Sequence, residues 1–225
     1  TCEQLVTVND TELPAITCPA DVEVSVDEDM CTASGFDLGT PITSDNCGVD
    51  IVASDAEVLY APGIHTITWT VLDVNGNVNS CQQTLTVIDD QLPVITCPEA
   101  LTASADMGEC TASMLDLGTP VTTDNCDVQG VVNDAPETFA FGPTTVTWLV
   151  TDVNGNENTC EQLVTVADDE LPLIACPDNV VVSTDEGICT ATGVELGTPV
   201  YSDNCGVSIV ENDAVEPYMS GETIV

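Results

Sequence analysis

The sequence contains no lysine and no arginine among its 225 residues, whereas it contains 39 aspartates and glutamates. The formal net charge is −39, so a folded form of the chain repels itself unless cations neutralise part of that charge. Without basic side chains the chain cannot bind phosphate groups by charge. Nucleic acids and anionic membranes are therefore excluded as electrostatic partners.

The residue types that carry most enzyme chemistry are also scarce. A catalytic site needs a nucleophile, a base or a metal in a pocket, and the chain has one histidine, His65, and no cationic group for an oxyanion or a phosphate. Adjacent carboxylates such as Asp89 and Asp90 point in opposite directions along an extended chain. No histidine accompanies the cysteines at zinc-ligand spacing. We predict that the chain is not an enzyme.

What the sequence does have is an internal repeat of 79 residues. All 12 cysteines fall into four sets with this step: Cys2, Cys81 and Cys160; Cys18, Cys97 and Cys176; Cys31, Cys110 and Cys189; Cys47, Cys126 and Cys205. The motifs Leu-Gly-Thr-Pro and Asp-Asn-Cys recur with the same step. We predict the end of one repeat at 1–10, repeats at 11–89 and 90–168, and an incomplete repeat at 169–225. We also expect these residues to be an excerpt of a longer array.

Strand patterns dominate each repeat. Residues 21–26, 65–73 and 81–87 alternate apolar and polar positions and are rich in β-branched residues, which indicates half-buried strands. The Asn-Gly pair in the stretch Asp-Val-Asn-Gly-Asn predicts a tight hairpin turn between the second and third of these strands. No stretch shows a helical stripe. We predict an all-β fold of small antiparallel sandwiches, with Trp69 and Trp148 in their cores.

The cysteines indicate an oxidising compartment, because four recur in each repeat, an even and regular number. We therefore predict disulfide bonds and an extracellular location. The sequence shows no membrane-spanning segment within these 225 residues.

The order of motifs resembles the hyalin repeat, or HYR, family along the whole chain. The motifs are Leu-Pro-Val-Ile-Thr-Cys-Pro, Cys-Thr-Ala-Ser, Thr-Pro-Val-Thr-Thr-Asp-Asn-Cys and Thr-Asp-Val-Asn-Gly-Asn-Glu-Asn-Thr-Cys. The resemblance implies tandem sandwiches like those of immunoglobulin and fibronectin type III domains, with two disulfides each. It also implies extracellular adhesive or matrix proteins and arrays on cell surfaces, and we expect a bacterial source.

The same resemblance implies how the cysteines pair, namely first with fourth and second with third in each repeat. The implied bonds are Cys18–Cys81, Cys31–Cys47, Cys97–Cys160, Cys110–Cys126 and Cys189–Cys205. Cys2 and Cys176 then pair outside the sequence.

Acidic and amide residues gather in three places of each repeat: the linker, the Asp-Asn-Cys loop and the hairpin turn. In a sandwich these segments meet at one end, where their oxygen atoms suit Ca²⁺. The alternative is a set of solvated turns, which Asp and Asn favour in any case. The predicted ligands are Asp10, Glu12, Asp45, Asp73, Asn75, Asp89, Asp90, Asp124, Asp152, Asn154, Asp168, Asp169 and Asp203.

Three functions remain open at this point. We favour a structural array, a stalk or filament that Ca²⁺ stiffens at its junctions and whose partners are neighbouring repeats or copies of itself. An adhesin that binds glycan or protein through its loops is the alternative, and an acidic matrix that binds mineral is a third. Completion of a neighbour's fold by a donated strand also stays open beside the excerpt of one long chain.

Overall fold

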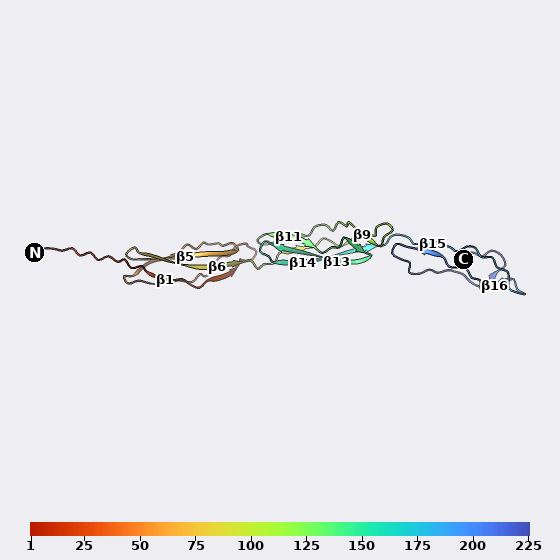
Figure 1. Cartoon of the computed structure of the whole chain (residues 1–225), viewed down its shortest axis with the longest axis horizontal. Helices are drawn as coiled ribbons and strands as arrows, with labels where there is room; N and C mark the ends of the chain where they lie inside the picture. The colour runs from red at the N-terminus through yellow and green to blue at the C-terminus, as the bar shows by residue number, and fades with distance from the viewer. The chain divides into compact units, whose positions relative to one another are not determined.

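The computed structural model describes residues 1–225 and contains strands but no helix. Its contacts divide the chain into two compact units. One comprises residues 1–96, 120–132 and 148–160, and the other comprises residues 97–119, 133–147 and 161–225. The division passes through the second repeat, so each unit holds residues from that repeat together with one of its neighbours. Figure 1 follows the strands along the chain.

The first repeat forms one main sheet of four strands, in the order β2-β6-β5-β4. Strands β5 and β6 are antiparallel, and β2 runs parallel to β6. A short antiparallel pair, β1 with β3, and an isolated bridge between Ala33 and Tyr60 lie outside this sheet. The strands are β1 (Ala15–Thr17), β2 (Val22–Ser25), β3 (Ile42–Ser44), β4 (Val49–Ser54), β5 (Gly63–Asp73) and β6 (Val78–Ile88).

The second repeat copies this arrangement, with a main sheet in the order β11-β13-β14-β8. Its short pairs are β10 with β7 and β12 with β9. The strands are β7 (Val94–Thr96), β8 (Leu101–Ser104), β9 (Thr111–Ser113), β10 (Val121–Thr123), β11 (Val128–Asn133), β12 (Thr138–Ala140), β13 (Gly142–Asp152) and β14 (Glu157–Ala167).

The third repeat shows two short pairs. They are β15 (Leu173–Ala175) with β17 (Val200–Ser202) and β16 (Thr190–Ala191) with β18 (Tyr218–Met219). The all-β sandwich that the alternating pattern predicts is confirmed. The prediction that its strands are antiparallel is wrong for one pair in each main sheet, because β2 with β6 and β8 with β14 run parallel.

The core of the first repeat follows from the alternation along β5 and β6. Ile67, Leu85 and Val87 are buried in one cluster, and Trp69 packs against it half-buried. The threonines between them face away from the core because successive side chains of a strand point to opposite faces. Trp148 is buried in the second repeat, so both tryptophans lie in cores as predicted.

A buried glutamine joins this core to the loops. The Gln83 side chain accepts a hydrogen bond from the Trp69 indole at 2.9 Å and donates to the carbonyls of Ala20 at 2.6 Å and Leu38 at 2.9 Å. Its counterpart in the second repeat, Gln162, donates in the same way to the carbonyls of Glu99 and Leu117. Two segments outside the main sheet are thereby tied to its central strand.

The disulfides connect as well as brace the repeats. Cys18 is bonded to Cys81 inside the first repeat, as the resemblance implies. Cys97 and Cys160, the corresponding residues of the second repeat, are also disulfide-bonded.

The implied bond between Cys31 and Cys47 is wrong, because Cys31 is bonded to Cys126 of the next repeat, with their Cα atoms 4.6 Å apart. The bonds Cys110–Cys126 and Cys189–Cys205 are wrong for the same reason, since Cys110 is bonded to Cys205. The loop that carries the second cysteine of one repeat reaches the Asp-Asn-Cys loop of the following repeat instead of its own. The cysteines left unbonded are Cys2, Cys47, Cys176 and Cys189.

Candidate cation sites at the repeat ends

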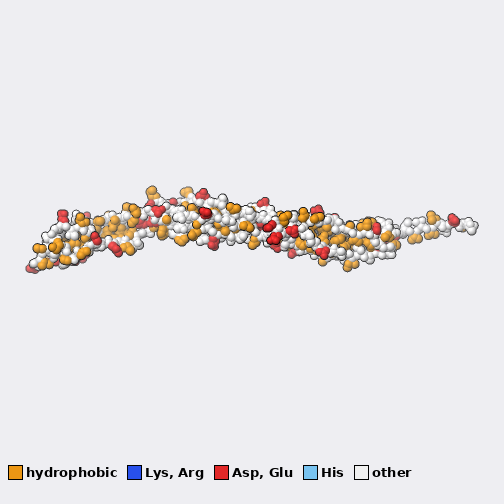
Figure 2. All heavy atoms as spheres, turned by 180° about the vertical axis from the view of Figure 1, so that it is seen from behind, with side chains coloured by type: hydrophobic (Ala, Val, Ile, Leu, Met, Phe, Trp, Pro, Cys, Tyr) orange, Lys and Arg blue, Asp and Glu red, His pale blue; other side chains and the backbone are white.

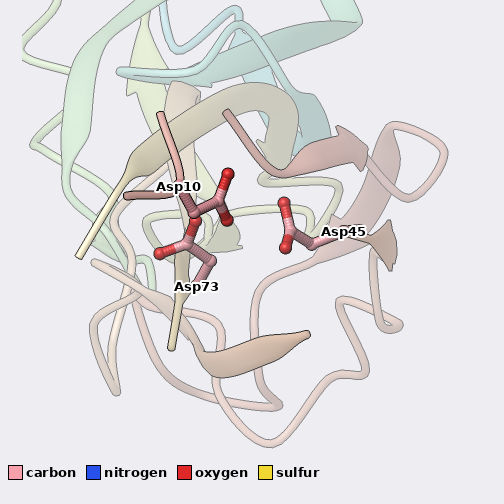
Figure 3. A group of neighbouring side chains, drawn as sticks. All are labelled: Asp10, Asp45 and Asp73. Carbon is pink, nitrogen blue, oxygen red and sulfur yellow. The ribbon is translucent and has the colours of Figure 1, made fainter. Parts of the chain in front are cut away.

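Three carboxylates from distant parts of the sequence meet at one end of the first repeat. Asp10 lies in the segment before β1, Asp45 follows β3, and Asp73 ends β5. One oxygen atom from each lies within 4.8 Å of the others. Figure 3 shows the three side chains turned toward one another. The linker, the loop and the hairpin therefore converge in the fold, as the hypothesis requires. A second such group forms from the same three positions of the next repeat, which are Asp89, Asp124 and Asp152.

Asp73 is fixed by the hairpin that it begins. Its Oδ1 atom accepts the backbone N–H groups of Asn75 and Asn77 at 2.8 Å each, and its Oδ2 atom accepts the Asn77 amide at 2.7 Å. Gly76 adopts a φ of 96°, which the tight turn requires and which side chains disfavour. Burial acts to raise the pKa of Asp73, but the hydrogen bonds from Asn77, Asn75 and Gly76 outweigh it, so this pKa lies below its ordinary value.

In both Asp45 and Asp10, one carboxylate oxygen accepts hydrogen bonds from nearby backbone N–H groups, whereas the other has no hydrogen-bond partner. Asp45 Oδ2 accepts the N–H groups of Cys47 at 2.8 Å and Gly48 at 3.0 Å, whereas its Oδ1 atom is buried without a hydrogen-bond partner. Asp10 Oδ1 accepts the N–H of Glu12 at 3.1 Å, and its Oδ2 atom is likewise buried and unpartnered. Buried oxygen atoms without partners are costly and call for an explanation.

The second group has the same construction. Asp152 is held by Asn154 and Asn156, and its pKa is lowered in the same way as that of Asp73. Asp124 Oδ2 caps its own loop through the N–H of Cys126 at 2.8 Å. Asp89 Oδ2, Asp124 Oδ1 and Asn125 Oδ1 are buried without partners. The unpartnered atoms therefore recur at equivalent positions, which argues against chance.

An unbonded thiol lies beside the first group. A hydrogen bond with the Asp10 side chain, then burial, then the charges of Asp10, Asp45 and Asp73 raise the pKa of Cys47. In the second group the equivalent residue, Cys126, is bonded to Cys31, and the Asn125 amide donates to the carbonyl of Met30 at 3.1 Å. The disulfide between repeats and the carboxylate group thus share one loop.

The donor atoms fit a hard cation. The three carboxylates of each group supply oxygen atoms and negative charge, and the sequence has no lysine or arginine to neutralise that charge. Figure 2 shows carboxylates on the visible face with no basic side chain among them. Ca²⁺ takes six to eight oxygen ligands, whereas Zn²⁺ prefers nitrogen and sulfur ligands, so the donor set favours Ca²⁺.

Several residues predicted as ligands lie outside these groups. Glu12, Asn75 and Asn154 contribute backbone N–H groups to the carboxylates. Asp90 accepts the Ser25 hydroxyl at 2.8 Å, and Asp169 accepts the Ser104 hydroxyl at 2.5 Å.

The third repeat holds only part of a group. Asp168 and Asp203 accept the N–H groups of Glu170 and Cys205, and the position that corresponds to Asp73 lies beyond residue 225.

Asn77, Asn156 and Asn125 lie in the hairpin and loop segments that the sequence predicts to converge, but they are not among the predicted ligands. The Asn77 and Asn156 amides clamp the central carboxylates and also donate to the carbonyls of Asp10 at 3.4 Å and Asp89 at 3.1 Å. Their signal was the second Asn of the hairpin motif, which recurs in both repeats. A turn needs only the Asn-Gly pair, so the second Asn was unexplained by the hairpin alone.

No helix of the structure has the length and apolar character needed to cross a membrane.

Comparison with known proteins identifies the repeat. The HYR domain model matches residues 9–87 and 88–166. The protein "Hyalin" of Strongylocentrotus purpuratus is 27% identical over 164 residues, which cover 68% of this chain and 14% of that protein. "Hyalin" of Lytechinus variegatus is 26% identical over 231 residues, which cover 96% of this chain and 43% of that protein. The chain thus spans less than half the length of either relative, and neither supports the expected bacterial source.

Among solved structures, Drosophila N-cadherin EC1-4 is 10% identical and superposes with a TM-score of 0.37, covering 69% of this chain and 50% of that one. A likeness this distant carries no argument about function.

Proposed function

The chain belongs to the HYR domain family, and from this premise we propose that it is a structural array of extracellular repeats that binds Ca²⁺ where successive repeats meet. Residues 11–89 and 90–168 are successive repeats in this proposal, and the partners are neighbouring repeats or further copies. The disulfide bonds support an extracellular location or a cell surface, because cytosolic reductants would open them.

One observation carries the proposal: each group of three carboxylates contains buried oxygen atoms that no donor satisfies. Asp10 Oδ2 and Asp45 Oδ1 belong to the first group, and Asp89 Oδ2 and Asp124 Oδ1 to the second. Solvated turns, the alternative interpretation, would leave such atoms in contact with water. Like charges placed together destabilise the fold unless a counter-charge accompanies them.

The residues of the chain prepare the site before any ion arrives. The hairpin fixes Asp73, and the Asp-Asn-Cys loop fixes Asp45 through its N–H groups. The linker brings Asp10, and the Asn77 amide holds that linker by its Asp10 carbonyl. When bound, Ca²⁺ would supply two positive charges and complete the partners of the free oxygen atoms. The linker between repeats would then be tied to the repeat that follows it.

Calorimetric titration of the metal-free chain with CaCl₂ tests the proposal, with MgCl₂ and NaCl of equal ionic strength as comparisons. We expect saturable Ca²⁺ binding and a rise in stability of about 2.7 kcal/mol when free Ca²⁺ reaches about 100 times the dissociation constant. Asp45→Asn should weaken binding at the first group while its amide oxygen still caps the loop. Asp50→Asn, an equal change of charge at an exposed position of β4, should leave binding intact.

Two results would reject the cation site. One is equal stabilisation by NaCl at matched ionic strength, which would mean general screening of the negative charge. The other is equal loss of binding in Asp45→Asn and Asp50→Asn, which would mean that no particular carboxylate is used.

Adhesion through loops remains a second candidate, because one groove differs between repeats. It encloses about 530 Å³ and is lined by residues that include Asp55, Glu57, Tyr60 and His65. The Tyr60 and His65 rings meet edge to face at 5.0 Å. The second repeat has Thr144 in place of His65, so a ligand of this groove would bind one repeat and not the next. A glycan array probed with the wild-type chain and with His65→Thr would test this candidate.

A further inference from the structure

Two successive residues of one loop in the second repeat contact two successive residues of the first repeat. The Asn125 amide donates to the carbonyl of Met30 at 3.1 Å, and Cys126, the next residue, is disulfide-bonded to Cys31. Asp124, the residue before Asn125, supplies one of the three carboxylates of the second group. A single loop therefore carries a candidate cation ligand, a hydrogen bond to the preceding repeat and a covalent bond to it.

A second carboxylate of the group is held by the same contact. Asp89 Oδ1 accepts the Asn125 amide and the N–H of Gln91, each at 3.2 Å. The Gln91 side chain in turn accepts the N–H of Asp29 at 3.0 Å and donates to the carbonyl of Asp27 at 3.0 Å. The position of Asp89 therefore depends on the turn of the first repeat that contains the bonded cysteine.

The third carboxylate, Asp152, is held differently, because its hydrogen bonds come from its own hairpin. Two of the three ligand positions thus depend on how the repeats meet, and one does not. The oxygen atoms without donors belong to those two: Asp89, which is only 6% exposed, has a buried and unpartnered Oδ2 atom, and Asp124 has a buried and unpartnered Oδ1 atom. These are the atoms whose partners a bound cation would complete.

The same construction recurs where the third repeat follows the second. Cys110 is bonded to Cys205, and the Asn204 amide donates to the carbonyl of Glu109 at 2.8 Å. A linker side chain, Glu170, again accepts a backbone N–H of the preceding turn, at 2.9 Å. The combination of disulfide, amide contact and linker contact is therefore a feature of the repeat and not of one position.

We propose that the disulfide between repeats sets the cation affinity of the carboxylate group beside it. With the Cys31–Cys126 bond intact, the loop and the linker hold their carboxylates beside Asp152 despite the repulsion of like charges. After reduction only hydrogen bonds hold them, so part of the binding free energy of the ion is used to bring them back together. The inference rests on the Ca²⁺ binding proposed above. Because coupling is reciprocal, bound Ca²⁺ also makes this disulfide harder to reduce.

Reduction of the bond needs a thiol, and dithiothreitol serves as the probe. One molecule delivers two electrons and two protons. The S–S bond breaks, Cys31 and Cys126 become thiols, and dithiothreitol leaves as its cyclic disulfide. Neither cysteine is among the buried residues, so a small thiol can approach the bond.

Calorimetric titration with CaCl₂ tests the coupling in a parent chain that carries Asp45→Asn. This change removes a carboxylate from the first group, so the second group is the complete one. In this parent we expect Cys31→Ser with Cys126→Ser to weaken Ca²⁺ binding about tenfold, a coupling of ordinary size. Cys18→Ser with Cys81→Ser, the matched control inside the first repeat, should leave the affinity unchanged.

The disulfide gives a second readout that needs no substitution. The wild-type chain is equilibrated in dithiothreitol redox buffers with CaCl₂, or with EDTA and NaCl of equal ionic strength, then alkylated and mapped after peptic digestion, since trypsin has no sites. We expect Ca²⁺ to make the reduction midpoint of Cys31–Cys126 more negative by about 30 mV, which equals a tenfold change for a two-electron couple. The midpoint of Cys18–Cys81 should not move.

Asn125 is a positioning residue in this proposal, because it joins the turn of one repeat to the linker and loop of the next. In Asn125→Ala the Ca²⁺-dependent shift of the midpoint should shrink, although both cysteines remain. A shift of full size in this variant would overturn the role of the amide.

The coupling is overturned if Ca²⁺ binds equally to the parent and to its Cys31→Ser, Cys126→Ser variant, or if the midpoint is the same in CaCl₂ and EDTA. Those results would leave Ca²⁺ binding itself intact. An equal shift of both disulfides would also overturn it, because that outcome means general stabilisation of the fold. Absence of saturable Ca²⁺ binding to the wild-type chain would instead reject the proposed function, and the coupling with it.

Discussion

At the scale of single residues, the two carboxylates that end β5 and β13 are held in place by the hairpins that follow them. Asp73 and Asp152 are fully buried, yet each accepts three hydrogen bonds from the hairpin that follows it. The hydrogen bonds outweigh burial and keep both side chains ionised. Local turn geometry thus places a negative charge at each repeat end at neutral pH.

This arrangement predicts acid sensitivity. Because the pKa of Asp73 is lower in the folded state, its ionised form contributes stability above its unfolded pKa of about 3.9, and this contribution is lost as pH falls through the folded pKa. Urea unfolding in EDTA should therefore show a fall in stability below about pH 4. Asp73→Asn should be less stable at neutral pH and should lose part of that fall, whereas Asp50→Asn should retain it.

A second prediction concerns the thiol beside the same carboxylates. The pKa of Cys47 is raised first by its hydrogen bond with Asp10, so less thiolate is present near neutral pH than in a free cysteine. Asp10→Asn should lower this pKa and accelerate alkylation of Cys47 by iodoacetamide, followed by peptide mass spectrometry at several pH values. Glu3→Gln, in the same exposed segment, is the control. An unchanged rate in Asp10→Asn would mean that Asp10 does not influence the thiol.

At the scale of strands, alternation was enough to predict β5 and β6, because one face of each is buried and the other is not. Gln83 breaks that pattern: it stands in the inward register with Leu85 and Val87 and is buried. Alternation marks Gln83 as a polar residue in an apolar register, but two of its three partners, the carbonyls of Ala20 and Leu38, lie 63 and 45 residues away in sequence. The role of such a residue depends on tertiary contacts, which no local pattern specifies.

Gln83→Ala should therefore be costly. It would leave the Trp69 indole and the carbonyls of Ala20 and Leu38 without their partner, at a cost of about 2–4 kcal/mol of unfolding free energy. Denaturant unfolding followed by tryptophan fluorescence would measure it. Gln82→Ala, on the exposed face of the same strand, should change stability by less than about 0.5 kcal/mol. Equal effects of the two changes would contradict the role of Gln83.

At the scale of the whole molecule, a periodic sequence does not show which repeat supplies the disulfide partner of a given cysteine. Cys31 is 16 residues from Cys47 and one repeat farther from Cys126, so both candidates belong to the same set. The direction in which the Cys31 loop points decides the matter, and that direction is a tertiary property. The convergence of Asp10, Asp45 and Asp73 was predictable, since strand direction alone places their segments at one end.

Removing the bond between repeats should leave the repeats folded. In Cys31→Ser with Cys126→Ser, hydrogen exchange should rise in the Asp-Asn-Cys loop of the second repeat and in residues 27–32. Strands β5 and β6 should stay protected, because Cys18–Cys81 and the core remain. Cys18→Ser with Cys81→Ser, the matched control, should instead lower protection in those strands. The prediction fails if both variants lose protection in the same places.

The interleaved disulfides also decide how the protein carries a pulling force. A load applied between Cys18 and Cys205 need not pass along the whole intervening backbone. It can run along residues 18–31, cross to Cys126, return along residues 126–110 and cross to Cys205. The long strands β5 and β6 lie off this route, so they bear no load while the bonds are intact. Single-molecule stretching should show almost no stepwise lengthening between these points until a reductant is added. With its disulfides intact, the molecule would therefore extend very little under load. The residues enclosed by the bonds would lengthen it only after the disulfides are reduced.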